Sequence, residues 1–289
     1  MNKQKHLIVI GGPTASGKTA FAVEVAKHFN SEILSCDSRQ FFREMNIGTA
    51  KPRIEERQGI PHHFIDSHSI FDTYNVGDFE KDALALLENI YQKHDIIVAV
   101  GGSGLYIKAL CEGLDQFPDV PENIRQEVRQ LYAGQGLQGL QDAIQKADPD
   151  YFEIVDQQNP HRLIRALEVC IASGQPFSAF RKAQSTPRNF IPIYIQLDLP
   201  REALYERINQ RVDDMMEKGL LNEVKSLYPY RNLTTLQTVG YQELFDYLDG
   251  KISLEEAVEK IKQNSRNYAK RQLTWWRRDG FWQIFHPQQ

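Results

Sequence analysis

The sequence predicts an α/β fold, in which a parallel β-sheet is flanked by helices and the chain carries one helical insertion domain. Three observations predict it. Short apolar runs alternate with helical patterns early in the chain, a glycine-rich turn follows the first run, and the middle of the chain lacks any run typical of a strand. Strands that are apolar throughout are typical of parallel sheets covered on both faces.

Each predicted strand is a short apolar run. These runs span residues 7–10, 32–36, 96–100 and 190–199. Helices are predicted at residues 20–29 and 79–90, where apolar residues recur at helical spacing. Gly12, Asp37 and Gly101 follow the ends of the first three strands. Because ligands bind beyond the carboxyl ends of parallel strands, we expect these three residues at the functional site.

The middle of the chain predicts a helical domain of its own. Pro118 and Pro121 lie at its start and Pro187 at its end, and no strand-like run lies between them. Its clearest helix begins with Asn159 as the N-cap and Pro160 at the first helical position. We therefore expect residues 114–188 to form the insertion and residues 1–113 and 189–289 to form the core.

The core after its last predicted strand is expected to be helical. Residues 253–256 form a capping box that opens a long helix extending to about Arg278. On a helical wheel, Arg266, Lys270 and Arg277 share one side, here called the basic stripe. The opposite side carries Leu254, Ala257, Val258, Ile261, Tyr268, Ala269, Trp275 and Trp276. We expect the apolar side to pack into the core, and the basic stripe to be either a solvated face or a surface for phosphates.

Composition excludes several classes of protein. Of the 289 residues, 41% are hydrophobic and 25% are charged, as in ordinary globular domains. No apolar run approaches the ~20 residues of a membrane helix, and the N-terminus does not resemble a signal peptide. The three cysteines are far apart, so we expect a reducing cytoplasm and no structural zinc. The net charge of −4 excludes a uniformly basic surface but allows a local one.

The turn after the first strand matches the phosphate-binding pattern G-x-x-x-x-G-K-[ST]. Its residues are Gly12, Pro13, Thr14, Ala15, Ser16, Gly17, Lys18 and Thr19. The glycines let backbone N–H groups wrap around a phosphate, and the start of the following helix adds positive charge. Lys18 supplies a point charge, and Thr19 supplies a hydroxyl for Mg²⁺ or a phosphate oxygen. We therefore expect a P-loop NTPase-like core that binds a diphosphate or a triphosphate.

Two carboxylates are candidates for the chemistry beside this loop. Asp37 ends the second strand, which lies beside the phosphate loop in a doubly wound sheet, and Asp198 ends an apolar run later in the chain. Small-molecule kinases keep a carboxylate at the first position to activate an acceptor. The loop recognises phosphate oxygens whatever they are attached to. A small-molecule kinase and a nucleotide-dependent RNA-binding module are therefore alternatives that the loop leaves open.

Further motifs lie along nearly the whole chain. They are residues 37–40 (DSRQ), 45–52 (MNIGTAKP), 60–66 (IPHHFID), 101–106 (GGSGLY), 159–168 (NPHRLIRALE), 211–220 (R-x-x-x-M followed by GL), 239–241 (VGY) and 268–272 (YAKRQ). Together with the phosphate loop, these segments resemble the tRNA dimethylallyltransferase (tRNA isopentenyltransferase) family. Phe42 stands where the family usually has Tyr, His161 where Gln is common and Ser103 where Thr is often found. Any role of a hydroxyl at position 42 is lost here.

The resemblance implies transfer of a dimethylallyl group from dimethylallyl diphosphate to N6 of the adenosine 3′-adjacent to the anticodon in tRNA, with release of diphosphate. It implies that residues 12–19 bind the diphosphate with Mg²⁺, for which Thr19 is the metal ligand. It further implies that Asp37 acts as the base, while Thr19 and Arg211 face the leaving group. The adenine must leave its stack, so the enzyme must grip the anticodon stem-loop.

The resemblance also assigns residues to tRNA binding. They are Asp37, Ser38, Arg39, Gln40, Ser103, Arg125, His161, Arg162, Leu163, Ile164, Arg165, Gly240, Tyr241, Arg266, Lys270 and Arg277. With the family in view, phosphate contact by the basic stripe is favoured over a solvated face. The implied partners are tRNA and dimethylallyl diphosphate, with no membrane. We expect a monomer in the cytoplasm.

Two further features allow more than one interpretation. His62 and His63 are adjacent, so on a strand they point to opposite faces, and no further ligands at suitable spacing accompany them. A structural or substrate-contacting role is therefore expected for them rather than a metal site. Ser103 lies at a strand end, where contact with the RNA or the acceptor base and a simple tight turn both remain open.

Overall fold

The computed structural model describes residues 4–181, 186–278 and 281–286. The chain divides into two compact units. The core unit comprises residues 1–111 and 187–289, and the helical unit comprises residues 112–186. The sequence predicted an insertion at residues 114–188.

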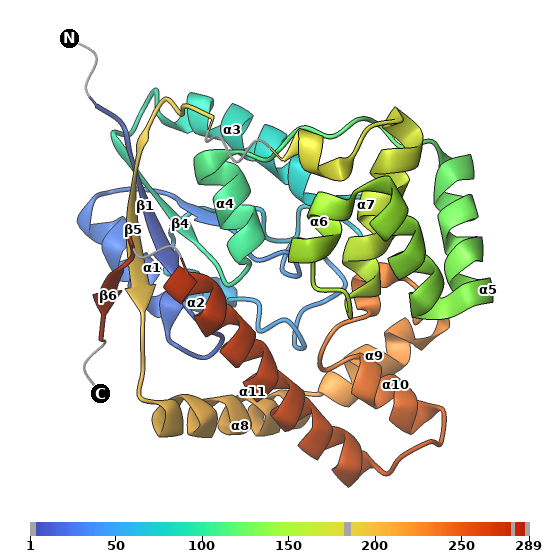
Figure 1. Cartoon of the computed structure of the whole chain (residues 1–289). Coiled ribbons are helices and arrows are strands. Elements are labelled where there is room, and N and C mark those ends of the chain that lie inside the picture. The colour runs from blue at the N-terminus through green and yellow to red at the C-terminus, as the bar shows by residue number, and fades with distance from the viewer. Residues whose placement is uncertain (1–3, 182–185, 279–280, 287–289) are drawn as a thin grey trace. The chain divides into compact units, whose positions relative to one another are not determined.

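The described part of the core unit contains one parallel sheet with the strand order β3-β2-β4-β1-β5-β6 (Figure 1). Its strands are β1 (His6–Gly11), β2 (Ile33–Ser35), β3 (His62–His63), β4 (Ile96–Val100), β5 (Ile191–Leu197) and β6 (Gln283–Phe285). β1 lies between β4 and β5, with Ile10 opposite Val100 and Gly11 opposite Gln196. Because neighbouring strands are parallel, their carboxyl ends meet at one edge. The turn after β1 therefore opens at the middle of that edge.

Helices cover both faces of this sheet. Leu7 and Val9 belong to the hydrophobic cluster that α3 (Val76–Ile90) and α4 (Gly104–Glu112) cover. Ile8 and Ile10 belong to the cluster that α1 (Lys18–His28) covers. Burial on both faces explains why β1 is apolar at successive positions. The predicted fold class is confirmed.

The rest of the core unit is mainly helical. It contains α2 (Ile54–Arg57), α8 (Arg201–Glu217), α9 (Leu220–Leu227), α10 (Gln242–Leu248), α11 (Leu254–Arg278) and the 3₁₀ turns η2 (Tyr228–Tyr230) and η3 (Thr234–Leu236). The predicted capping box starts α11, because Ser253 N–H donates to Glu256 and Glu256 N–H donates to Ser253 Oγ. In Figure 1, α11 runs beside α8 and α10, with which it is in contact.

The helical unit consists of α5 (Glu122–Ala147), α6 (Pro149–Ile154), α7 (Pro160–Ser173) and the 3₁₀ turn η1 (Phe177–Phe180). The predicted N-cap of α7 is confirmed, because the side chain of Asn159 accepts the backbone N–H of Arg162 at 3.3 Å. The two ends of the unit meet where the N–H of Thr186 donates to the carbonyl of Glu112 at 2.6 Å.

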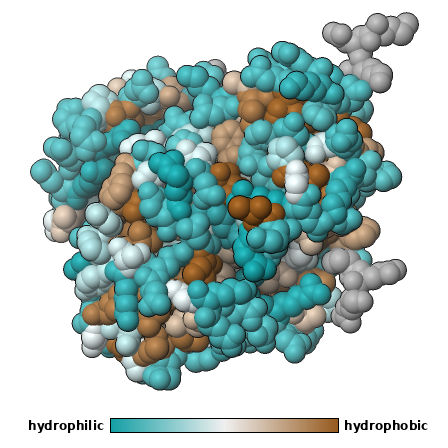
Figure 2. Space-filling model, turned by 180° about the vertical axis from the view of Figure 1, so that it is seen from behind, coloured by the Kyte–Doolittle hydropathy of each residue, from teal (hydrophilic) through white to brown (hydrophobic). Residues whose placement is uncertain are grey.

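The strands predicted at residues 7–10, 32–36, 96–100 and 190–199 are confirmed as β1, β2, β4 and β5. β3 was not predicted, and the expectation that the chain after residue 199 is helical is wrong for β6. Neither strand is a run of apolar residues, because β3 consists of two histidines and β6 begins with Gln283. The face in Figure 2 is mainly hydrophilic, with apolar side chains in small patches. Among the described helices, none is long and apolar enough to cross a membrane.

Candidate active site

A cavity of about 840 Å³ lies in the core unit. The phosphate loop forms one side of it, and most of residues 46–58 form another. The remaining lining includes Asp37 after β2, Gly101 after β4, Arg211 on α8, and Tyr268 and Gln272 on α11. The cavity thus collects residues from the carboxyl edge of the sheet, as the sequence predicted for Asp37 and Gly101.

The phosphate loop offers the backbone N–H groups at the start of α1 to a ligand. Gly12 has φ +142°, and a Cβ there would lie 2.8 Å from the carbonyl oxygen of Leu197, so only glycine fits. α1 starts directly after Gly17, which is left-handed, and no described side chain caps this start. The first N–H groups of a helix lack partners inside it, so an anion can accept from them.

Two cations flank this loop. The ammonium of Lys18 donates to the carbonyl of Pro13 at 2.6 Å, within the loop itself. Desolvation and the nearby Arg211 lower the pKa of Lys18 to about 7, although Asp37 opposes the shift. Arg211 donates from its guanidinium to Thr14 Oγ1 at 3.1 Å. A bound anion would favour the charged form of Lys18, because it would supply the negative charge that the loop lacks.

Of the two candidate carboxylates, Asp37 is the one that lines the cavity. Its Oδ1 accepts the backbone N–H of Arg39 at 3.0 Å, which fixes the side chain in a turn. Burial raises the pKa of Asp37, and the nearby Lys18 only partly opposes this. The other candidate, Asp198, is absent from the described lining, and its Oδ1 accepts the N–H of Leu199 at 3.1 Å. A carboxylate with a raised pKa is suited to accept a proton.

The residues of the loop fit a magnesium ion bound together with a phosphorylated ligand. Thr19 lines the cavity, and Ser16 Oγ is fully buried with no hydrogen-bond partner among the described residues. Mg²⁺ prefers oxygen ligands and is usually bound through one or two side chains plus substrate phosphates. The described residues contain no group of three or more His, Cys, Asp or Glu side chains arranged to hold a metal.

A hydroxyl cluster lies beside Asp37. Ser103 Oγ accepts the N–H of Ser38 at 3.1 Å and donates to Ser38 Oγ at 3.2 Å. Ser103 is therefore more than a turn residue, since it ties the loop after β4 to the loop after β2. Tyr268 also interacts with Ser103, and burial raises the pKa of Tyr268 to about 12. The prediction that Tyr268 lies in the core is wrong: its side chain is 38% exposed because it lines the cavity.

A carboxylate that the sequence did not indicate holds the cavity wall formed by residues 46–58. Glu223 on α9 accepts the backbone N–H groups of Asn46 (3.1 Å), Ile47 (2.8 Å) and Gly48 (3.0 Å). The hydroxyl of Tyr241 donates to the same carboxylate at 2.6 Å. No motif marks Glu223 in the sequence, because its partners are backbone groups far away along the chain.

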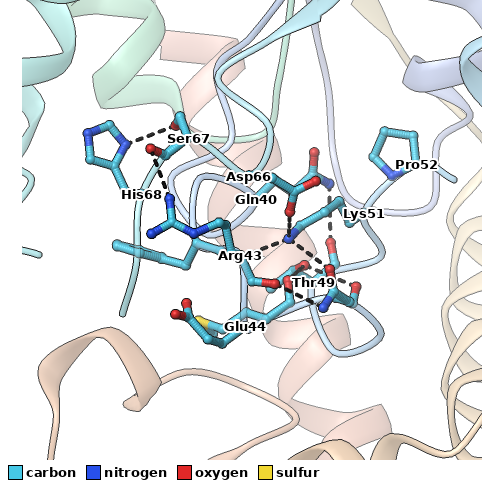
Figure 3. A network of polar contacts seen from close by, with 12 residues as sticks. Gln40, Arg43, Glu44, Thr49, Lys51, Pro52, Asp66, Ser67 and His68 are labelled. Atoms are coloured by element: carbon cyan, nitrogen blue, oxygen red, sulfur yellow. Dashed lines mark hydrogen bonds and ion pairs between the residues drawn. The ribbon is translucent and has the colours of Figure 1, made fainter. Parts of the chain in front are cut away.

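The same wall contains the polar network in Figure 3. Lys51 donates to Asp66 Oδ1 at 2.5 Å and to the carbonyl of Phe42 at 2.8 Å. Gln40 donates to the carbonyls of Thr49 (3.2 Å) and Ala50 (3.3 Å). The side chain of Lys51 is only 5% exposed, so its ammonium group pairs with Asp66 and does not face the solvent. Phe42 contributes its carbonyl to this network while its ring is buried.

The two histidines have different surroundings. His62 lines the cavity, and its Nδ1 lies 2.8 Å from the carbonyl oxygen of Ile60. Burial lowers the pKa of His62. His63 Nε2 lies 2.6 Å from a carboxylate oxygen of Glu32, so this residue has a structural partner within the sheet.

Most residues assigned to tRNA by the resemblance are accessible. Exposed members are Arg125, His161, Arg162, Arg165, Lys270 and Arg277, while Asp37, Ser38, Arg39, Gln40, Ser103, Ile164 and Arg266 are partly exposed. Arg39 donates to the carbonyl of Thr235 at 2.7 Å, and Arg266 donates to Asn209 at 2.6 Å. These two arginines therefore already have protein partners.

Three assigned residues are buried. Leu163 and Tyr241 are 0% exposed, and Gly240 is buried too. Leu163 packs inside the helical unit, while the hydroxyl of Tyr241 donates a hydrogen bond to Glu223. A motif marks all of its residues alike, and it does not separate those on the inner side of a helix or loop from those on the outer side.

The fold and the site define a class of protein: a phosphate-loop protein with a buried carboxylate positioned beside a site for a phosphorylated ligand. Residues 40–279 match the protein family described as IPP transferase. This match spans most of the chain, and the chain belongs to that family.

Named relatives agree with this assignment. The tRNA dimethylallyltransferase of Flavobacterium johnsoniae is 50% identical over 281 residues, and that of Christiangramia forsetii is 53% identical over 274 residues. Each match covers 95% of this chain and 91% of the relative.

Solved structures with similar folds include the tRNA isopentenylpyrophosphate transferase of Bacillus halodurans. It is 40% identical with a TM-score of 0.72, and the match covers 98% of this chain and 90% of that one. A eukaryotic dimethylallyltransferase described as acting on tRNA is 28% identical with a TM-score of 0.82. That match covers 98% of this chain and 74% of that one.

Proposed function

We propose that the chain is a tRNA dimethylallyltransferase, which transfers a dimethylallyl group from dimethylallyl diphosphate to N6 of the adenosine 3′-adjacent to the anticodon. Family membership supports the reaction class, as do the relatives that carry this name. The observation that carries the proposal is that one cavity contains both the phosphate loop and Asp37. The cavity can therefore bind the leaving diphosphate and place a proton acceptor near it.

The leaving group is stabilised by the phosphate loop. As the bond between the allylic carbon and the bridging oxygen breaks, its electron pair leaves with the diphosphate, whose negative charge grows. Lys18, Arg211 and the N–H groups at the start of α1 are positioned to offset that charge. Mg²⁺, held by Thr19 and the phosphate oxygens when bound, supplies further neutralisation.

The acceptor is activated by Asp37. N6 of the adenine forms the new bond to the allylic carbon and must lose one proton, which the carboxylate of Asp37 accepts. Burial raises the pKa of Asp37, so its conjugate acid is stabler than that of an ordinary aspartate. Tyr268 and the serine pair Ser38 and Ser103 lie beside this group and are candidates to contact the base.

The tRNA is expected to contact both units. In the helical unit, for which we propose tRNA binding, Arg125, His161, Arg162 and Arg165 are exposed. In the core unit, the basic stripe exposes Lys270 and Arg277. Phosphate contacts of this kind position an RNA without reading its sequence. Monomeric state and cytoplasmic location stay predictions.

One assay tests this function. The protein is incubated with tRNA, Mg²⁺ and dimethylallyl diphosphate, and the tRNA is weighed by mass spectrometry and digested to nucleosides. The expected result is a gain of one C5H8 unit on the adenosine beside the anticodon. Asp198→Asn is the matched control for Asp37→Asn, since Asp198 lies outside the described cavity lining. Release of ADP from ATP would favour the kinase, and RNA binding without either product would favour the binding module.

A second assay tests the use of the phosphate loop. Inorganic pyrophosphate is expected to inhibit competitively against dimethylallyl diphosphate, because both present phosphate oxygens to the same N–H groups. ATP is expected to be hydrolysed negligibly with or without tRNA. Steady, tRNA-stimulated release of ADP would contradict a prenyl donor.

A further inference from the structure

A side-chain amide joins the two glycine-containing loops of the cavity. Gln272 on α11 accepts the backbone N–H of Thr14 with Oε1 at 2.8 Å and donates from Nε2 to the carbonyl of Gly102 at 2.8 Å. Its side chain is buried, with 6% exposed. One residue thus connects the phosphate loop after β1 with the loop after β4.

The chemistry of this position requires an amide. Among side chains of this length, only the amide carries an acceptor and a donor on one terminal carbon. The fit is also tight, because a Cβ at Gly102 would lie 2.4 Å from Gln272 Nε2. The missing side chain at Gly102 therefore leaves room for the amide. This one contact joins a residue of the motif GGSGLY to a residue of the motif YAKRQ.

The contact acts directly on the phosphate loop. Thr14 is held through its backbone by Gln272 and through its hydroxyl by Arg211. The same loop carries Gly17 and Lys18, which lead into α1. Because the shape of the loop decides where its N–H groups point, fixing Thr14 fixes the geometry offered to the diphosphate.

We propose that Gln272 is a positioning residue that sets the phosphate loop for the diphosphate and links this loop to the helix that carries the basic stripe. The inference rests on the proposed function only through the identity of the ligand. Tyr268, one helical turn before Gln272, lines the same cavity, while Lys270 between them is exposed. α11 therefore presents one side to the donor site and another to solvent.

The test is direct binding of inorganic pyrophosphate with Mg²⁺, measured by calorimetry on the full chain. Gln272→Leu leaves the N–H of Thr14 and the carbonyl of Gly102 without this partner and is expected to weaken binding by about 10- to 100-fold, while tRNA affinity stays unchanged. Gln263→Leu is the control, since Gln263 is an exposed glutamine on the same helix. Unchanged pyrophosphate affinity in a folded Gln272→Leu variant would overturn the proposal.

A second variant keeps the test decisive if the first does not fold. Gln272→Glu retains the acceptor for Thr14 but offers a donor to Gly102 only when its carboxyl is protonated. Its pyrophosphate affinity, relative to that of the wild type, is expected to rise as the pH falls. An identical pH profile for both proteins would contradict a positioning role. Failure of the wild type to bind pyrophosphate would instead contradict the proposed function.

Discussion

The two sides of the cavity use backbone N–H groups in opposite ways. The phosphate wall, residues 12–19, is one continuous turn whose N–H groups at the start of α1 have no side-chain cap. The loop wall, which comprises most of residues 46–58, has its N–H groups at positions 46–48 already occupied by the carboxylate of Glu223. The N–H groups of the phosphate wall are therefore available to an anion of the substrate, whereas those of the loop wall already bind the carboxylate of Glu223.

This difference shows that a ligand-binding surface and a structural surface can depend on the same interaction, between backbone N–H groups and an anion. Clustered N–H groups attract negative charge in either case. Where the chain supplies the charge, the segment becomes a fixed wall. Where it supplies none, the segment becomes a ligand site. The predictions that follow test this distinction, from the largest expected effect to the smallest.

Asp37 lines the same cavity as the two walls, and its replacement is expected to have the largest effect. Asp37→Asn removes the proton acceptor, so kcat should fall by about 10²- to 10⁴-fold while tRNA affinity changes little. Single-turnover kinetics and a tRNA-binding assay measure the two quantities. Near-normal turnover would remove Asp37 from the mechanism.

Lys18 tests the phosphate wall. Lys18→Ala should raise the KM for dimethylallyl diphosphate and lower kcat together, by about 10²- to 10³-fold in kcat/KM, because the charge it faces grows in the transition state. Steady-state kinetics at saturating tRNA measure this. A rise in KM with kcat intact would mean that Lys18 binds donor and transition state equally.

Glu223 tests the loop wall. Glu223→Gln replaces an acceptor-only group by one that points an NH₂ at backbone N–H groups, so we expect a loss of about 2 kcal/mol in the free energy of unfolding. Urea denaturation measures it, with the exposed Glu217→Gln as control. Full stability together with a large fall in kcat would show that the wall is catalytic rather than supporting.

The pKa of Lys18 predicts a pH dependence of diphosphate binding. This pKa is lowered to about 7 in the free protein, and a bound diphosphate raises it. Binding therefore takes up a proton above pH 7, and affinity should fall by up to about tenfold per pH unit there. Calorimetry in buffers of different ionisation enthalpy detects the proton. Lys18→Ala should abolish the uptake.

The basic stripe is expected to give the smallest effect. Replacing Arg266, Lys270 and Arg277 with Gln should reduce the slope of log affinity for tRNA against log salt by roughly two, at about 0.7–0.9 per phosphate contact. Lys260→Gln, at an exposed position on another side of α11, is the control. An unchanged slope would identify the stripe as a solvated face.

The sequence predicted what is local. The phosphate loop, the strands β1, β2, β4 and β5, the N-cap at Asn159 and the capping box before α11 each depend on residues close together in the chain. The fold class follows from these elements, because apolar strands that alternate with helices leave few other arrangements.

What could not be predicted depends on tertiary partners. Glu223 and Gln272 bind backbone groups that lie far away in the sequence. Because nearly every residue type carries the same backbone groups, the sequence does not show which of them are bound. Tyr268 was assigned to the core because a helical wheel gives the side of a helix but not what lies opposite it. Leu163 was assigned to tRNA with its whole motif, although it faces inward.

The hydrogen bond between Thr186 and Glu112 joins the two ends of the helical unit. On the core side of the same junction, Arg188 donates to the carbonyls of Ala109 and Leu110. The chain therefore leaves the core and returns to it at neighbouring points, as is usual where one domain is inserted into another. We expect that a short glycine-serine bridge in place of residues 112–186 would not have to span a long distance. The two chain segments of the phosphate-binding core are therefore joined to each other where the helical unit begins and ends.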